Sequence, residues 1–356
     1  MGRIEAALTR LWWRERRTAL AWLLWPLSVL YRLVLALRGA AYALGLRRAQ
    51  HAPVPVIVVG NLVAGGAGKT PTVIALLRVL REAGLRPGVI SRGHGRRGGG
   101  VDEVTAASTA AAVGDEPLLI RRRSGVPVWV ARRRIEAARA LCAAHAEVDV
   151  LVADDGLQHL ALAREVQLIV FDERGIGNAA LLPAGPLRQP MPAHVPMNSH
   201  VLYNAPRPST PWPGAMAERG LGGAVRLRDW WAGAPPQPAA LEALRGRPLL
   251  AAAGMAAPQR FFAMLREAGL QITPLPLGDH YRFDPLPWPA HTPDVVLTEK
   301  DAVKLDASAD GATRIWVVTL DFRLPEAFSA ALLDNLRRLQ RAPRAPQPTP
   351  NADHEP

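Results

Sequence analysis

The chain has 356 residues, of which 49% are apolar and 21% are charged. This balance excludes a disordered chain and a polytopic membrane protein, and the length suggests two domains with accessory segments. Lys and Arg number 43 against 31 Asp and Glu, which gives a net charge of +12. Since no nucleic-acid-binding module is recognisable, we interpret the charge as attraction to an anionic membrane surface, with general solubility as the alternative. The one cysteine, Cys142, excludes an internal disulfide and indicates a reducing compartment.

Residues 1–50 form the first predicted unit, a membrane-associated helix. Residues 1–18 are amphipathic, with adjacent tryptophans and arginines, whereas residues 19–37 carry Arg32 as their single charge. A helix over that apolar stretch is about 28 Å long, which barely spans a bilayer core. Because Pro26 predicts a kink and Arg32 is costly at the bilayer centre, we expect a shallow monotopic helix or a marginal single span. The alternative is a helix buried in a protein core.

The second predicted unit, residues 51–240, is a nucleotide-binding core. Five short β-branched runs are typical of buried parallel strands, and helical stretches separate most of them. This alternation predicts an α/β fold, with a parallel sheet covered on both faces and an active site beyond the carboxyl ends of its strands. A stretch from about 185 to 245 is rich in Pro and Gly. The five runs are residues 54–60, 86–93, 126–130, 149–156 and 166–173.

The third unit, residues 241–340, is predicted to be a smaller C-terminal α/β lobe. It contains three further strand-like runs, at 247–254, 294–301 and 315–322, and a helical pattern after the first of them. Residues 341–356 are rich in Pro and polar side chains, a composition that predicts a disordered tail.

A glycine-rich turn, GNLVAGGAGKTP at residues 60–71, connects the first predicted strand to a helix. Such a turn presents successive backbone N–H groups and a helix N-terminus to an anion, which predicts a phosphate-binding loop of the P-loop NTPase type for ATP. Lys69 would reach the β- and γ-phosphates, and the Thr70 hydroxyl would bind Mg²⁺. The match is imperfect, because Val63 stands where the usual pattern has its first glycine. The residues expected to bind the nucleotide are Gly65, Gly66, Ala67, Gly68, Lys69 and Thr70.

The fourth predicted strand ends in two carboxylates, Asp154 and Asp155. A phosphate-binding loop needs an acidic residue at the end of a neighbouring strand, where it holds Mg²⁺ directly or through water. We therefore expect the metal ligands to be Thr70 and one or both of these aspartates. Paired aspartates also occur as ordinary turn residues, which is the alternative.

Several motifs, in this order along the chain, resemble those of the tetraacyldisaccharide 4′-kinases, the lipid A 4′-kinases (LpxK) of Gram-negative bacteria. The family usually has an aromatic residue where this chain has His94 and Leu157, neither of which we assign to chemistry. The motifs are GNLVAGGAGKTP at 60–71, SRGHG at 91–95, GDEP at 114–117, DDGLQH at 154–159, LLPAGPLR at 181–188, GMAAPQRFF at 254–262, LGDHYRF at 277–283 and LTEKDAVK at 297–304.

The resemblance implies that ATP phosphorylates the 4′-hydroxyl of a tetraacylated glucosamine disaccharide 1-phosphate, a lipid A precursor. The acceptor lies in the membrane and ATP is cytosolic, so the enzyme is expected at the cytoplasmic face of the inner membrane. Nearby arginines would meet the 1-phosphate, and no nucleic acid or obligate protein partner is expected. The alternative is a membrane-bound regulatory or transport ATPase with the same loop, and the polar motifs GDEP and LGDHYRF favour the kinase.

The resemblance also implies a catalytic pair, with Asp115 accepting the proton of the acceptor hydroxyl and His280 orienting Asp115 or sharing that proton. Taken alone, each of the two is equally compatible with a structural role. Four further basic residues stay open between substrate contact and a structural role: Arg92, Arg188, Lys300 and Lys304.

Substitution of Lys69 tests the phosphate loop. Lys69→Ala is expected to remove most phosphoryl transfer, because the lysine charge would stabilise the negative charge that develops on the phosphate oxygens. The measurement is kcat with saturating ATP and acceptor. Retention of more than about a tenth of the wild-type kcat, a loss below about 1.4 kcal/mol, would contradict this role.

Overall fold

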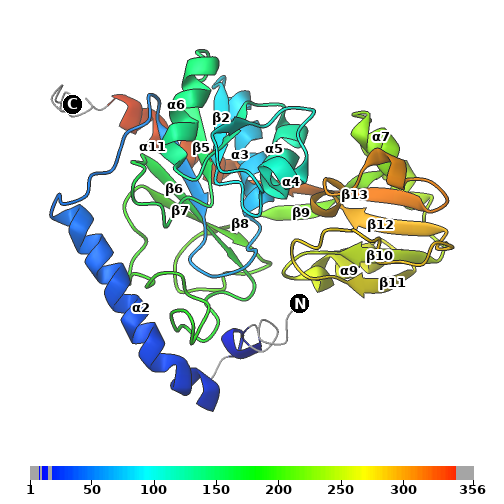
Figure 1. Cartoon of the computed structure of the whole chain (residues 1–356), viewed down its shortest axis with the longest axis horizontal. Helices are drawn as coiled ribbons and strands as arrows, with labels where there is room; N and C mark the ends of the chain where they lie inside the picture. The colour runs from blue at the N-terminus through cyan, green and yellow to red at the C-terminus, as the bar shows by residue number, and fades with distance from the viewer. Residues whose placement is uncertain (1–7, 9, 15–17, 342–356) are drawn as a thin grey trace.

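The computed structural model describes the chain except for residues 1–7, 9, 15–17 and 342–356. The strands of this described part form two sheets, which lie side by side in Figure 1. Most of the predicted tail, as well as part of the amphipathic segment at residues 1–18, lies outside the described residues.

The larger sheet has the strand order β3-β4-β2-β5-β1-β6-β7-β8. Among these strands β3 is antiparallel to its neighbour and the other pairs are parallel, so the predicted α/β class with a parallel sheet is confirmed. The bounds are β1 Val56–Gly60, β2 Pro87–Ser91, β3 Asp102–Glu103, β4 Val128–Val130, β5 Val150–Asp154, β6 Val166–Asp172, β7 Ser199–Asn204 and β8 Ala215–Met216.

Helices cover both faces of this sheet because its central strands are apolar on both sides. Ile57 and Val59 of β1 belong to the same core cluster as the apolar residues of α3 and α5. The alternate β1 residues, Val56 and Val58, belong to a second cluster with α6. The bounds are α3 Lys69–Glu82, α4 Ala110–Val113, α5 Asp115–Ser124 and α6 Arg134–Ala144.

The smaller sheet has the order β11-β10-β12-β13-β9, with β9 antiparallel to β13 and the other pairs parallel. Short helical segments and α9 accompany it (Figure 1). The bounds are β9 Glu218–Arg226, α7 Leu227–Trp231, α8 Pro238–Glu242, β10 Leu249–Ala253, α9 Pro258–Glu267, β11 Ile272–Pro276, β12 Asp294–Thr298, α10 Glu299–Ala302, a 3₁₀ turn Ala307–Ala309, β13 Arg314–Arg323 and α11 Glu326–Arg341.

The observed smaller lobe does not coincide with the predicted unit, residues 241–340, at either end. Strand β9 precedes residue 240 yet pairs along its length with β13. Its sequence, ERGLGGAVR, contains three glycines and lacks the pattern of a strand, so its pairing partner decides its conformation. At the other end, α11 packs against α3, and its Leu332 and Leu336 belong to the core cluster that includes β1. The chain therefore returns to the larger sheet before residue 340.

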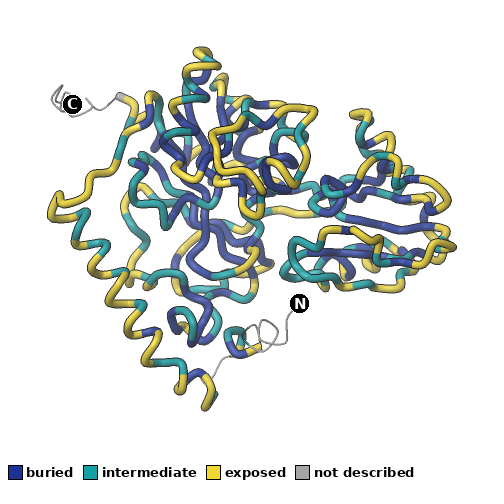
Figure 2. Tube along the Cα trace, viewed as in Figure 1, coloured by how far each residue is buried: buried dark blue, intermediate teal, exposed yellow. Residues whose placement is uncertain are grey.

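Helix α2, Ala19–Ala43, is longer than the predicted apolar stretch and continues through Pro26. Its buried residues are Ala21 and Ser28, and Figure 2 shows the helix largely exposed along its length. Leu23 is 75% exposed and Leu37 is 62% exposed. A helix of a protein core would bury most of its side chains, so that alternative does not describe α2. By length and composition, α2 could cross a membrane.

Polar side chains hold α2 against the rest of the protein. Ser28 Oγ donates to the Leu181 carbonyl at 2.9 Å and accepts from the Ala184 N–H at 3.1 Å. The Tyr31 hydroxyl donates to the Arg188 carbonyl at 2.8 Å. Ser28 and Tyr31 thus face the protein while most leucines of α2 face outward, which is the reverse of a helix on a water-soluble surface.

Replacement of Leu23, Leu30, Leu33 and Leu37 by Gln tests whether this face enters a membrane. We expect the variant to lose most binding to anionic lipid vesicles in a flotation assay, because several exposed apolar side chains no longer gain from burial in lipid. ATP binding should be unchanged. Deletion of residues 1–49 is expected to weaken membrane association in the same way and to lower activity on acylated acceptor more than nucleotide binding. Unchanged flotation of both variants would contradict the interpretation.

Candidate active site

The phosphate loop lies between β1 and α3, which begins at Lys69. Gly68 has φ 90°, a left-handed backbone conformation that favours glycine, and a Cβ there would lie 2.2 Å from Asn204 Nδ2 at the end of β7. Lys69 Nζ lies 3.3 Å from Asn61 Oδ1 and 3.8 Å from Asp155 Oδ1. Thr70 is buried in the first turn of the same helix.

Strand β5 pairs in parallel with β1, and Val59 lies opposite Asp154. This register brings Asp154 and Asp155 to the edge where the phosphate loop begins. Asp155 Oδ1 lies 2.7 Å from Arg188 Nη1. Burial raises the pKa of the Asp155 carboxyl, but the charges of Lys69 and Arg188 more than offset it, so this pKa lies below its ordinary value.

Asp154 differs from its neighbour because, among the described residues, no cation forms an ion pair with its carboxyl group as Arg188 does with Asp155. Its Oδ1 is buried without a hydrogen-bond partner among the described residues, and its Oδ2 accepts from Ser91 Oγ at 3.4 Å. Burial, followed by the negative charges of Glu116 and Asp155, raises the pKa of Asp154 to about 7. A buried carboxyl group with an orphaned oxygen beside other carboxylates suits a bound cation.

The chemistry of these residues fits Mg²⁺. Within the described residues, no three His, Cys, Asp or Glu side chains cluster as a metal cage. Mg²⁺ does not need one, because it usually binds through one or two carboxylates and completes its shell with water and substrate phosphates. Asp154 Oδ1 and the Thr70 hydroxyl supply protein oxygens at the phosphate loop.

Asp115 and His280 meet although 165 positions separate them in the sequence. Asp115 is the first residue of α5 and is buried, and His280 lies in the loop after β11. His280 Nδ1 lies 2.9 Å from Asp115 Oδ2. Burial raises the pKa of Asp115, but the hydrogen bond to His280 and the charges of Lys300, His280 and Lys304 lower it by more. The pKa of Asp115 therefore lies below its ordinary value. The same hydrogen bond raises the pKa of His280 above its ordinary value, so the pair favours carboxylate with imidazolium.

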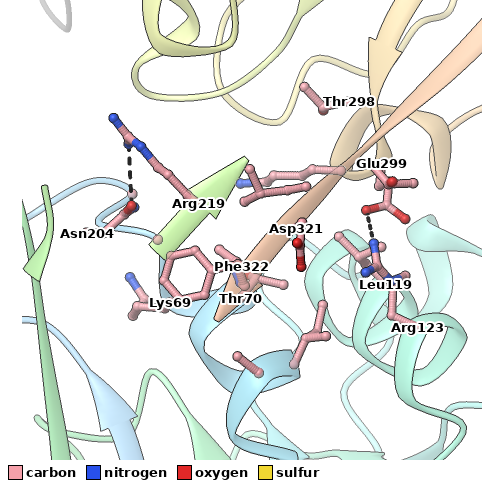
Figure 3. A pocket seen from close by; sticks show the side chains of 18 of the residues that line it. Lys69, Thr70, Leu119, Arg123, Asn204, Arg219, Thr298, Glu299, Asp321 and Phe322 are labelled. Carbon is pink, nitrogen blue, oxygen red and sulfur yellow. Dashed lines mark hydrogen bonds and ion pairs between the residues drawn. The ribbon is translucent and has the colours of Figure 1, made fainter. Parts of the chain in front are cut away.

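A cavity of about 690 Å³ lies over the phosphate loop. Its lining includes Gly66, Lys69 and Thr70 as well as Glu116 and Lys300, which border the Asp115–His280 pair. Figure 3 shows Lys69 and Thr70 on one side of this cavity and the ion pair of Arg123 with Glu299 on the other. Apolar side chains of α3, α9 and β13 complete the wall. The phosphate loop therefore lines this cavity, and the Asp115–His280 pair lies directly behind the lining residues Glu116, Asp279 and Lys300.

Residues 20–337 match the family model described as tetraacyldisaccharide-1-P 4′-kinase. The chain belongs to this family. It is 55% identical to the tetraacyldisaccharide 4′-kinase of Methylibium petroleiphilum, over 92% of this chain and 93% of the relative. It is 54% identical to the enzyme of the same name from Leptothrix cholodnii, over 93% and 96%. The sequence-based recognition of the family is thus confirmed.

A crystal structure of LpxK from Aquifex aeolicus in complex with ATP has the same fold, with a TM-score of 0.72 and 24% identity. The comparison covers 90% of this chain and 99% of that one. Among the 4′-kinase motifs, the structure places GNLVAGGAGKTP, DDGLQH and LLPAGPLR together through Lys69, Asp155 and Arg188. It places GDEP, LGDHYRF and LTEKDAVK together through the Asp115–His280 pair and Lys300.

The four basic residues whose roles the sequence left undecided have different surroundings. Arg188 Nη1 contacts Asp155 and also Asn61 Oδ1, at 3.2 Å. Lys304 Nζ lies 2.8 Å from the buried Asp301 carboxylate, which makes a structural role the simpler interpretation for this lysine. Arg92 is exposed at the end of β2. Lys300 contacts two carboxylates, those of Glu116 and Asp279.

Several residues of the site are missing from the sequence-based set. Asn61 accepts from both Lys69 and Arg188, and the Arg174 guanidinium donates to the Gly66 carbonyl at 2.7 Å. Arg134 donates to the main-chain carbonyls of Asp154 and Asp155. Asn61 lies inside a quoted motif and could have been found there, whereas the run containing Arg134 has only the pattern of an ordinary helix.

Asp115→Asn is expected to lower kcat at least about a hundredfold with little change in ATP affinity, because the amide keeps the shape of the side chain but cannot accept the proton. His280→Ala should impair the same step, so the double variant should lose much less than the product of the two losses. An Asp115→Asn enzyme near the wild-type rate would exclude Asp115 as the base. Fully multiplicative losses would show that the two residues act independently.

The pH dependence of kcat gives a second test of the pair. If Asp115 accepts the proton, its ionised form is the active one, and activity should fall as pH drops through its pKa. The hydrogen bond to His280 lowers that pKa. His280→Ala removes the hydrogen bond and should therefore move the acid limb of the kcat–pH profile to higher pH. An acid limb that stays in place or moves to lower pH would contradict the assignment.

Proposed function

We propose that this chain is an ATP-dependent kinase that phosphorylates the 4′-hydroxyl of a tetraacylated glucosamine disaccharide 1-phosphate. The observation that carries the proposal is the family match over residues 20–337, combined with a phosphate loop that lines a cavity and a part-buried Asp115–His280 pair at the border of that cavity. The curated relatives are named as kinases of this substrate class, so a regulatory or transport ATPase is not favoured. ATP as the donor is supported by the fold neighbour, whose crystal structure is a complex with ATP.

On the donor side, the phosphate loop would bind the triphosphate. Lys69 now contacts Asn61 and Asp155 and would exchange these acceptors for β- and γ-phosphate oxygens. Thr70 and Asp154 would hold the Mg²⁺, and Asp155 would keep Lys69 and Arg188 in position. When bound, the ion would neutralise charge on the β- and γ-phosphates. The orphaned oxygen of Asp154 is the reason for preferring it to Asp155 as the direct ligand.

On the acceptor side, Asp115 would accept the proton of the 4′-hydroxyl as its oxygen forms a bond to the γ-phosphorus. The bond from that phosphorus to the bridging oxygen breaks, and ADP leaves. His280 would hold the Asp115 carboxylate in place through its Nδ1 contact. Because Asp115 is buried, its proton acceptance would be confined to a hydroxyl bound where the cavity borders the pair, beside Glu116 and Lys300.

The acyl chains of the acceptor would lie with the outward face of α2 in the cytoplasmic leaflet of the inner membrane. The segment at residues 181–188 joins α2 to the phosphate loop, because Arg188 meets Tyr31 through its carbonyl and Asp155 through its guanidinium. Burial and the charges of four arginines lower the pKa of the nearby His159 ring to about 4. Three of these arginines are at least partly exposed and would receive the 1-phosphate, namely Arg38, Arg92 and Arg164, whereas Arg134 is buried against the carbonyls of Asp154 and Asp155.

The fate of the γ-phosphate distinguishes the two functions. The protein is incubated with γ-labelled ATP, Mg²⁺ and the tetraacylated acceptor in vesicles, and label is measured in lipid and in free phosphate. The kinase proposal expects label in the lipid, and none with an acceptor whose 4′-hydroxyl is replaced by hydrogen. Free phosphate released at the same rate with both acceptors, without labelled lipid, would favour the ATPase.

A further inference from the structure

Lys300 makes two charged contacts beside the Asp115–His280 pair. It is the second residue of α10, and its side chain is 18% exposed. Its Nζ lies 3.1 Å from Glu116 Oε1 on α5 and 3.1 Å from Asp279 Oδ1 in the loop after β11. Glu116 and Asp279 are the chain neighbours of Asp115 and His280. The Lys300–Glu116 and His280–Asp115 contacts therefore run side by side from the smaller lobe to α5, and the Lys300–Asp279 contact links them within the smaller lobe.

The second contact reaches His280 through a shared acceptor. Asp279 Oδ1 accepts from Lys300 Nζ and also from the backbone N–H of His280, at 3.1 Å. His280 has φ 58°, in the left-handed region that residues with a Cβ seldom adopt. A conformation of this kind persists when surrounding contacts determine it. The Asp279 carboxylate is such a contact, and Lys300 sets the position of that carboxylate.

The anchoring of α10 makes this cation well fixed. Thr298 caps the helix by accepting from the Asp301 N–H, and the buried Asp301 carboxylate accepts from Thr298, Lys304 and the Gly254 N–H. Burial alone would lower the pKa of Lys300, but the charges of Glu116, Asp279 and Asp115 raise it well above its ordinary value. Lys300 is therefore a permanent cation on a well-anchored helix.

We propose that Lys300 is a positioning residue for phosphoryl transfer, which holds His280 through Asp279 and binds the smaller lobe to α5 through Glu116. The proposal rests on the assignment of Asp115 and His280 as the proton-accepting pair. It gives the lysine of LTEKDAVK a role that differs from that of Lys69: Lys300 would orient the pair rather than contact phosphate.

The surrounding charges predict a pH signature for this role. Asp115 faces His280, Lys300 and Lys304, and His280 faces Asp115, Asp279 and Lys300, with the His94 ring 5.6 Å away. The Lys300 charge lowers the pKa of both members of the pair. Loss of that charge should raise both values and move the acid limb of kcat to higher pH. A residue with a purely structural role would lower the plateau without moving the limb.

The experiment compares Lys300→Met with Lys300→Arg in the full-length protein in lipid vesicles. Lys300→Met is expected to lower kcat at least about tenfold, because a misplaced catalytic group loses rate steeply, with little change in the KM for ATP. Its acid limb should move up by about one pH unit. Lys300→Arg keeps the charge and should recover part of kcat and the wild-type limb. Arg266→Met, an exposed charge removal on α9 of the same lobe, is the matched control and should change neither.

Three outcomes would overturn the proposal. Unchanged kcat in Lys300→Met shows that the contacts are dispensable, and a lower plateau with an unmoved limb shows a structural role. A rise of tenfold or more in the KM for ATP shows a phosphate contact instead. If thermal unfolding shows that Lys300→Met is not folded, Lys300→Gln takes its place and is judged by the same criteria. Asp115→Asn is measured in parallel. An active Asp115→Asn enzyme refutes the catalytic pair itself, whereas an inactive one supports the pair, so that the Lys300 variants then decide the role of Lys300 alone.

Discussion

The parallel register of β1 and β5 is the constraint on which the rest of the site depends. With Val59 opposite Asp154, the strand that leads into the phosphate loop and the strand that ends in two aspartates finish at the same edge. Parallel strands make this possible because their carboxyl ends share one side of the sheet. Lys69 and Arg188 then gather on Asp155, and Asp154 stays buried with an orphaned oxygen.

Charged contacts between the two lobes complete the site. His280 pairs with Asp115, Lys300 with Glu116, and Arg123 with Glu299, each joining α5 to the smaller lobe. These pairs therefore determine where the lobes meet more than how strongly each lobe folds. The proposed acceptor chemistry lies at that meeting point.

Helix α2 couples the outer apolar surface to this interior. Its leucines face outward, while Ser28 and Tyr31 bind the segment at residues 181–188, whose Arg188 reaches Asp155. A short series of contacts, from Tyr31 through Arg188 and Asp155 to Lys69, thus connects the exposed helix to the phosphate loop. A lipid acceptor held along α2 would meet the nucleotide site without leaving its membrane environment.

By itself, the sequence determined the α/β class, the central strands and the phosphate loop, because each depends on residues adjacent in the chain. β-Branched runs form buried strands, and glycines before Lys69 permit a close turn. The motifs also identified the family. Only the tertiary structure decided the pairing of glycine-rich β9 with β13, the inward polarity of Ser28 and Tyr31, and the contacts of Arg134 and Lys300. Each of these features depends on a partner far away in the sequence. Because its physical cause is the packing of one specific neighbour against another, it produces no pattern among residues adjacent in the chain.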